Sequence, residues 1–242
     1  MTATDLAQDG SVIWTTLAEP GLGLAQAVTR RRALTALLVS TLAALVATAV
    51  ILPHLDLAAL AAMKLRPDMT PHERTEAIET AAKLNAVMAW GGAALGPAIQ
   101  ALFVGCFLWL GFWTAGARTG FKETFTVTAH GLLPNALRGL LMAPAAVVHA
   151  PVNPMELDKL LPSSIAAFLP PGLPAPAIAA ASALDLFSLW SLYLVGTGMA
   201  KASGASRRRS FAVVAVLFVA YVALLKIAPS AAAGGPGPRG GP

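Results

Sequence analysis

The sequence predicts an all-α protein: a multi-pass transmembrane bundle of five helices, with a cytoplasmic amino terminus and a carboxyl terminus outside. Of its 242 residues only 12% are charged and 56% are hydrophobic, whereas roughly 25% of the residues of soluble proteins are charged. Long uncharged runs alternate with short basic clusters, as membrane spans and their cytoplasmic flanks do. This composition excludes a soluble cytosolic enzyme, a secreted disulfide-rich domain and a disordered regulator.

Residues 1–29 form a cytoplasmic segment ahead of the first span. Two interpretations stay open: the segment lies along the inner headgroup layer, or it is a mobile terminus. The first interpretation rests on a set of apolar residues that includes one aromatic: Val12, Ile13, Trp14, Leu17, Leu22 and Leu24.

Residues 30–228 form the membrane domain, and its first span covers residues 33–52. This run has no charged side chain and directly follows Arg30, Arg31 and Arg32. At ~1.5 Å per residue it is long enough to cross a hydrocarbon core of about 30 Å.

An outer helix is predicted over residues 71–88. Thr70 is placed to act as its N-cap, Pro71 takes the first helical position, and Glu73 completes a capping box. The acidic residues come early and Lys83 comes late, an order that complements the helix dipole. We expect this helix to run into the second span, residues 89–116, which has no charged residue.

Three further spans are predicted over residues 124–149, 176–200 and 210–228. The span over residues 124–149 is the weakest of them, because an arginine such as Arg138 costs ~2.5–3.5 kcal/mol at the centre of a membrane helix. Parity supports it: with five crossings, the basic clusters at residues 30–32, 118–122 and 201–209 all face the cytoplasm. Without it, the last cluster would face outward.

Two segments outside the spans are expected to lack long helices. The outer loop over residues 151–176 is rich in proline, which allows no more than short turns. The tail over residues 229–242 consists largely of Ala, Gly and Pro, and we predict it to be disordered.

Three polar residues are predicted to lie near the bilayer midplane: Gln100, Arg138 and Asp185. Counted from the outer end of its span, each lies at a depth of ~14–17 Å. A charge at this depth needs a partner inside the bundle, so we expect Arg138 to pair with Asp185, with Gln100 beside them. Two interpretations stay open: a structural clasp, or a site that moves protons or an ion. The clasp is favoured because a neighbouring guanidinium holds a carboxylate ionised and hinders a proton relay.

Other motifs point to packing rather than to chemistry. Gly92 and Gly96 form a small-residue motif for close helix approach, and the lone Cys106 is expected to be a small buried hydrophobe. The four histidines lack the spacing of a metal site, and neither a Gly-x-Ser-x-Gly elbow nor a phosphate-binding loop occurs. We therefore expect no catalytic residue, metal or cofactor. Nucleic acid is not expected as a partner, because the basic residues flank the spans.

The last spans carry a recognisable pattern. Residues 183–198 read Ala-Leu-Asp-Leu-Phe-Ser-Leu-Trp-Ser-Leu-Tyr-Leu-Val-Gly-Thr-Gly and precede a basic turn and a final apolar helix. Upstream, residues 120–134 have an aromatic-rich start that leads into a mid-span proline. Together these segments resemble the Yip domain family of five-pass membrane proteins, in its bacterial form, most strongly at Asp185, Trp190 and Gly196. The resemblance covers roughly residues 25–228 and implies a membrane location and a five-pass topology.

Eukaryotic members of that family resemble adaptors that bind small Rab-type GTPases. They carry an acid-Leu-Tyr-Gly-Pro-aromatic signature before the first span, and this chain has none, so the resemblance does not carry GTPase binding over to it. We expect a non-catalytic adaptor or organiser of the inner (cytoplasmic) membrane that binds other membrane proteins, membrane lipids or itself as a homo-oligomer. The alternative is a transporter or channel subunit whose pathway passes Gln100, Arg138 and Asp185. An intramembrane enzyme comes third.

Overall fold

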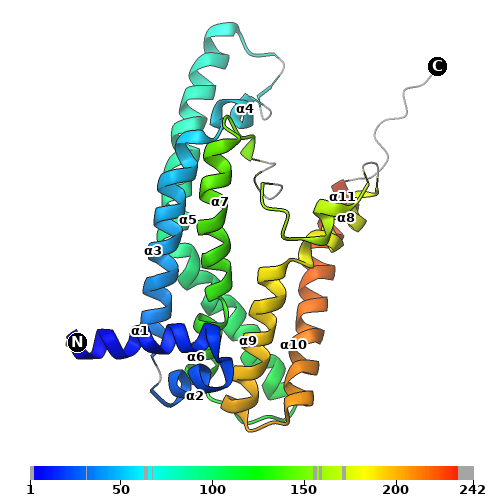
Figure 1. The fold of residues 1–242 in the computed structure, drawn as a ribbon. Coiled ribbons are helices and arrows are strands. Elements are labelled where there is room, and N and C mark those ends of the chain that lie inside the picture. Colours follow the sequence, from blue (N-terminus) through cyan, green and yellow to red (C-terminus); the bar gives the residue numbers. More distant parts are fainter. Residues whose placement is uncertain are drawn as a thin grey trace. The chain divides into compact units, whose positions relative to one another are not determined.

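The structure, a computed structural model, describes residues 3–30, 32–62, 65–66, 68–154, 157, 160–170 and 173–233, and this part of the protein consists of helices joined by turns and loops (Figure 1). Within these ranges extended pairing is limited to two isolated bridges. The predicted all-α class is therefore confirmed. The α-helices are α1 (Ala3–Ala18), α2 (Pro20–Arg30), α3 (Ala33–Ile51), α4 (Leu57–Ala62), α5 (Pro71–Thr114), α6 (Phe121–Gly131), α7 (Leu133–Val148), α8 (Ala175–Ala183), α9 (Leu186–Ser203), α10 (Arg207–Val222) and α11 (Ala228–Ala233).

In the described part of the chain, four helical segments are long and apolar enough to cross a membrane, as in a multi-pass membrane protein. They are Ala33–His54, Pro71–Thr114, Phe121–Val148 and Arg207–Ser230. They coincide with the first, second, third and fifth predicted spans. The predicted fourth span, residues 176–200, is not one helix: it is divided between α8 and α9 by a break at Leu184 and Asp185.

Three segments outside the predicted spans can also be compared with the structure. Residues 3–30 are not an irregular terminus but the two helices α1 and α2. The tail is helical as far as Ala233, in α11, and residues 234–242 lie outside the described part. In the proline-rich loop a short 3-10 helix, η3 (Ile165–Phe168), is present, as the prediction of short turns allows.

The chain divides into two compact units. Unit 1 comprises Met1–Ala36, Ala101–Asn135 and Pro162–Pro242, and unit 2 comprises Leu37–Gln100 and Ala136–Leu161. The helices α3 and α5 and the helical pair α6–α7 are therefore shared between the units, while α9 and α10 belong to unit 1 alone.

Unit 2 has a small apolar core of Ala47, Ile51, Met142, Ala143, Ala146 and Val152. The strand-like contact at Val152 closes it: the Val152 amide donates to the His54 carbonyl at 2.8 Å, and the Asp56 amide donates to the Val152 carbonyl at 2.9 Å. The Asp56 carboxylate then accepts the Ala59 amide at 2.8 Å, which begins α4. Short polar contacts thus fix the end of α3 against the start of the outer loop.

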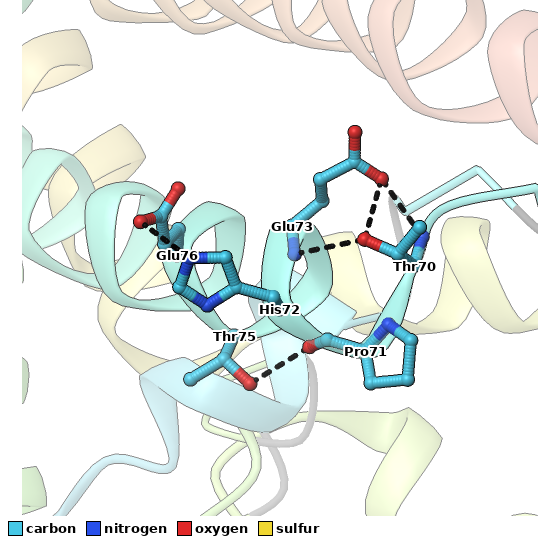
Figure 2. Close-up of polar contacts among 6 residues, drawn as sticks. All are labelled: Thr70, Pro71, His72, Glu73, Thr75 and Glu76. Carbon is cyan, nitrogen blue, oxygen red and sulfur yellow. Dashed lines mark hydrogen bonds and ion pairs between the residues drawn. The ribbon is translucent and has the colours of Figure 1, made fainter.

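The start of α5 is the capping box that the sequence predicts (Figure 2). The Glu73 amide donates to Thr70 Oγ1 at 3.3 Å, and the Thr70 amide and hydroxyl both donate to Glu73 Oε2 at 2.8 Å. These bonds to its ionised form lower the pKa of Glu73, a fully exposed side chain. His72 and Glu76 add an exposed contact of 3.4 Å one turn apart. From this cap α5 continues unbroken to Thr114, which confirms that the outer helix runs into the second span.

Unit 1 is built around α9, which packs against α2, α6 and α10. Its core contains Leu108, Phe112, Ala117, Val127, Val195, Met199 and Val214. The α6–α9 contact is close at two glycines: a Cβ added to Gly198 would lie 2.6 Å from a methyl of Val127, and one added to Gly131 would lie 2.5 Å from a methyl of Val195. Neither glycine leaves room for a side chain, so small residues set the spacing of this pair.

Replacing Thr70 by alanine removes the hydroxyl that the Glu73 carboxylate accepts and the N-cap oxygen. We expect the pKa of Glu73 to rise towards its ordinary value in this variant and the first turn of α5 to fray. Because the pKa is lowered in the folded state, the contribution of the box is present above the ordinary carboxyl pKa and is lost as pH falls through the lowered value. Carboxyl ¹³C titration of the chain in nanodiscs measures this, with Glu73→Gln for assignment. Thr75→Ala is the matched control, since Thr75 Oγ1 donates to the Pro71 carbonyl instead; an unchanged Glu73 titration in Thr70→Ala contradicts the argument.

Replacing Gly198 by alanine overpacks the α6–α9 contact, because Val127 is β-branched and stiff. We expect a loss of about 1–3 kcal/mol in the free energy of unfolding. Thermal or denaturant unfolding in detergent measures the loss, and Val127→Ala in the Gly198→Ala background restores part of it by vacating the space. Gly21→Ala is the control, since nothing lies within 4 Å of a Cβ there. Equal stability of Gly198→Ala and Gly21→Ala would show that the contact is looser than described.

Candidate functional site

Asp185 is the N-cap of α9 and is buried, with 3% of its surface exposed. The chain leaves the helical conformation at Leu184 (ψ 69°) and is extended at Asp185 (φ −103°, ψ 144°). The Asp185 Oδ1 accepts the amides of Phe187 at 2.9 Å and Ser188 at 3.2 Å, and its Oδ2 accepts the hydroxyl of Ser163. The carboxylate therefore satisfies donors at the start of a helix within an otherwise apolar segment.

The break between α8 and α9 is held by a second segment of chain. Ser164 and Asp185 form an isolated antiparallel bridge, in which the Leu186 amide donates to the Ser163 carbonyl at 2.9 Å and the Ile165 amide donates to the Leu184 carbonyl at 3.2 Å. The loop thus supplies backbone partners that a continuous helix would have supplied itself. We call residues 163–165 with 184–186 the paired break.

Sequence reasoning placed Asp185 inside a continuous span and missed this break. One signal was available, because aspartate is among the preferred N-cap residues. This signal is weak in the sequence, because the apolar run continues on both sides of Asp185 through Leu184, Leu186 and Phe187.

The other two residues of the predicted midplane cluster belong to unit 2. Gln100 on α5 is exposed, and Arg138 on α7 is partly buried. Asp185 belongs to unit 1. The pairing of Arg138 with Asp185 accordingly stays a prediction.

The glycines that the sequence singles out, two for helix packing and one for the family resemblance, divide into two kinds. Nothing lies within 4 Å of a Cβ placed on Gly92 or Gly96, so the close approach expected there is not made by the described residues. At Gly196, one of the three positions that carried the family resemblance, a Cβ would lie 2.9 Å from the ring of Phe211 on α10. Together with Gly131 and Gly198, this glycine is one of the tight contacts inside unit 1. Trp190 lies on α9 and is partly buried.

One end of unit 1 gathers exposed basic side chains, and we call this set the basic end: Arg118, Lys122, Lys201, Arg207, Arg208 and Arg209. The Arg207 guanidinium lies 5.8 Å from the ring centre of Tyr193 and 5.6 Å from that of Phe211, and it donates to the Tyr193 hydroxyl at 3.3 Å. Arg209 donates to the carbonyl of Ala115, just beyond the last turn of α5. A cation at this position complements the negative end of the helix dipole.

Three threonines and one histidine of α6 are buried, and each has a side-chain contact with the backbone of its own helix. The hydroxyls of Thr124, Thr126 and Thr128 each donate to the carbonyl four residues earlier. His130, which is 1% exposed, places Nδ1 3.0 Å from the Thr126 carbonyl. The helix thereby carries several polar groups through an apolar core at little cost.

No group of three or more His, Cys, Asp and Glu side chains suited to a metal ion occurs among the described residues. The single cysteine, Cys106, is partly buried and has a free thiol.

Comparison with known proteins gives one family. The search of curated proteins found no match, and neither did the search of solved structures. The model of the Yip1 domain matches residues 14–227, nearly the whole of the chain, and it includes the paired break, the basic end and the glycine contacts of α9. The chain therefore belongs to the Yip1 domain family of membrane proteins.

Proposed function

We propose that this protein is a non-catalytic adaptor or organiser of the cytoplasmic (inner) membrane that binds other membrane proteins, lipids or a second copy of itself. The observation that carries the proposal is the surface of α5 around Gly91, Gly92 and Gly96. All three glycines have open space at Cβ, and large apolar side chains such as Leu95 and Ile99 are exposed beside them.

This surface has the composition of a helix-docking face. In a bilayer, apolar side chains gain little by leaving lipid for a neighbouring helix, so association depends on close backbone approach and on van der Waals packing. Glycines at positions i and i+4 lie on one side of a helix and allow that approach. Inside unit 1, glycines already allow helices of the same chain to approach one another closely.

Five crossings fit the charge distribution best. If α8 and α9 together form the fourth crossing, the basic end and the arginines before α3 share the cytoplasmic side. The paired break then lies in the outer half of the membrane, and the capping box at the start of α5 lies at the outer surface.

Bulky residues at Gly92 and Gly96 test the docking surface. We expect Gly92→Leu with Gly96→Leu to abolish a specific, near-stoichiometric crosslink to a membrane protein or to a second copy, because leucine keeps the backbones apart. The measurement is in-membrane photocrosslinking from Leu95, followed by purification and mass spectrometry. Ala94→Leu is the matched control, since Ala94 is exposed on the same helix and lies about 160° around it from both Gly92 and Gly96. The unfolding midpoint should be equal in all variants, and an undiminished crosslink in the double variant counts against this surface.

A second candidate is a transporter or channel subunit whose pathway passes Gln100, Arg138 and Asp185. The paired break favours it, because discontinuous membrane helices occur at the solute sites of transporters. The same break also fits a purely structural role, in which Asp185 fixes the fold. A change that removes the charge and keeps the cap separates the two.

Asp185→Asn is that change, since asparagine is as good an N-cap as aspartate. We expect Asp185→Asn to lower the unfolding midpoint, because the amide nitrogen that replaces Oδ2 cannot accept the Ser163 hydroxyl, and to leave any ion flux in liposomes at the level of the wild-type chain. Asp185→Ala loses the cap as well and should cost about 0.5–2 kcal/mol more. Loss of flux with an unchanged midpoint would instead establish the transport function.

The predicted pairing of Arg138 with Asp185 is better tested by neutral substitutions than by exchanging the two charges. An arginine at position 185 cannot accept the amides of Phe187 and Ser188, so an exchange would fail for lack of a cap. We expect Arg138→Met and Asp185→Asn to be less destabilising together than the sum of the single changes. A double-mutant cycle of unfolding free energies measures this, and strict additivity would argue against the pair.

A further inference from the structure

We propose that the α1–α2 hairpin is embedded in the headgroup layer of the membrane, where Trp14 and Leu22 contact lipid. The occupant of this surface is thus the interface of the bilayer itself. This inference is independent of the adaptor role proposed above.

The first argument is the way the hairpin is built. Its two helices approach so closely that a Cβ on Gly23 would lie 2.3 Å from the backbone nitrogen of Thr16. α2 packs against α6 and α9, and the inner side of the hairpin is covered: Val12, Thr16, Leu24 and Ala27 are all buried. The hairpin is therefore a fixed part of unit 1 and not a tethered arm.

The second argument is the position along α6 and α9 at which the hairpin packs. The side chain of Leu24 lies 3.4 Å from a Cβ placed on Gly198, and Val28 packs against the core cluster that includes Val127 and Met199. Gly198 comes three residues before the exposed Lys201, so it lies ~4.5 Å further along α9 from the basic end. Val127 lies ~9 Å along α6 from its first residue, Phe121. The hairpin thus lies beside these helices, inward of the charges at the basic end.

The third argument is the chain itself. α2 ends at Arg30 and the membrane-spanning α3 begins at Ala33, so the end of α2 cannot be far from the membrane boundary. In Figure 1, α1 runs crosswise to α9, as a helix lying in the plane of the interface does. The connection to α3 and the packing against α6 and α9 therefore both place the hairpin at the depth of the membrane interface.

The exposed side chains of the hairpin have the composition expected at the membrane interface. Trp14 is 73% exposed and Leu22 is 57% exposed. The other exposed residues on α1 and α2 among positions 11–29 are small or carry no charge: Ser11, Ala18, Gly21, Gln26 and Thr29. Glu19, in the turn between the helices, is the charged residue in this stretch. Tryptophan is enriched at membrane interfaces, where its ring and its N–H group each find a suitable environment.

Site-directed spin labels test the depth directly. In a Cys106→Ala background, single cysteines replace Trp14 or Leu22, and the chain is placed in nanodiscs of phosphatidylethanolamine and phosphatidylglycerol. Arg208→Cys marks the basic end, Leu42→Cys marks the hydrocarbon, and Glu76→Cys marks water. We expect labels at positions 14 and 22 to be more accessible to oxygen than to a nickel chelate, with depths between those at positions 208 and 42.

Labels at positions 14 and 22 that are as accessible to the nickel chelate as those at positions 76 or 208 would overturn the proposal. The fluorescence of Trp14 gives a second measurement, which needs no spin label and leaves Leu22 in place. Trp14 is one of five tryptophans, so the emission of the wild-type chain minus that of Trp14→Phe reports on it alone. Lipids brominated near the headgroup should quench this difference strongly, and aqueous iodide should quench it weakly; the reverse order would show that Trp14 faces water.

Discussion

Close backbone contact along α9 is the constraint on which the rest of unit 1 depends. This helix packs against α2, α6 and α10, and at three places the approach is possible only because glycine stands there: Gly131 opposite Val195, Gly198 opposite Val127, and Gly196 opposite Phe211. In a membrane the hydrophobic effect does not drive helices together, so tight packing must supply the attraction. A single position, Gly198, is tight against Val127 of α6 and lies next to Leu24 of α2.

Several polar groups within the apolar segments are satisfied by nearby partners. The threonines of α6 donate to their own helix, Asp185 accepts the first amides of α9 and a serine hydroxyl, and the loop at residues 163–165 pairs with the broken backbone. Each arrangement avoids an unpaired group in a medium without water, where such a group costs several kcal/mol. The same arrangements serve a packed scaffold and a solute pathway equally well, which is why Asp185 supports two functional hypotheses.

Much of the fold follows from sequence because membrane spans are specified by local composition. The arginines before residue 33, the capping box at Thr70 and Glu73, and the uncharged runs each fix a helix by a short-range rule. The paired break was not predictable in this way, since its partners are Ser163 and Asp185, 22 residues apart along the chain. For the same reason the packing glycines were predicted at Gly92 and Gly96 from spacing alone, whereas inside unit 1 they are Gly131, Gly196 and Gly198.

The sequence by itself determined the all-α class, the membrane location, the start of α5 and the family, because each depends on hydropathy, on charge or on residues close together in the chain. Only the tertiary structure decided that Asp185 begins a helix, that residues 3–30 form a hairpin with one covered side, and which glycines are in contact. The physical reason is that burial and close approach are relations between distant segments. Periodicity shows that a helix has an apolar side, but the packing of the other helices decides which part of it is covered.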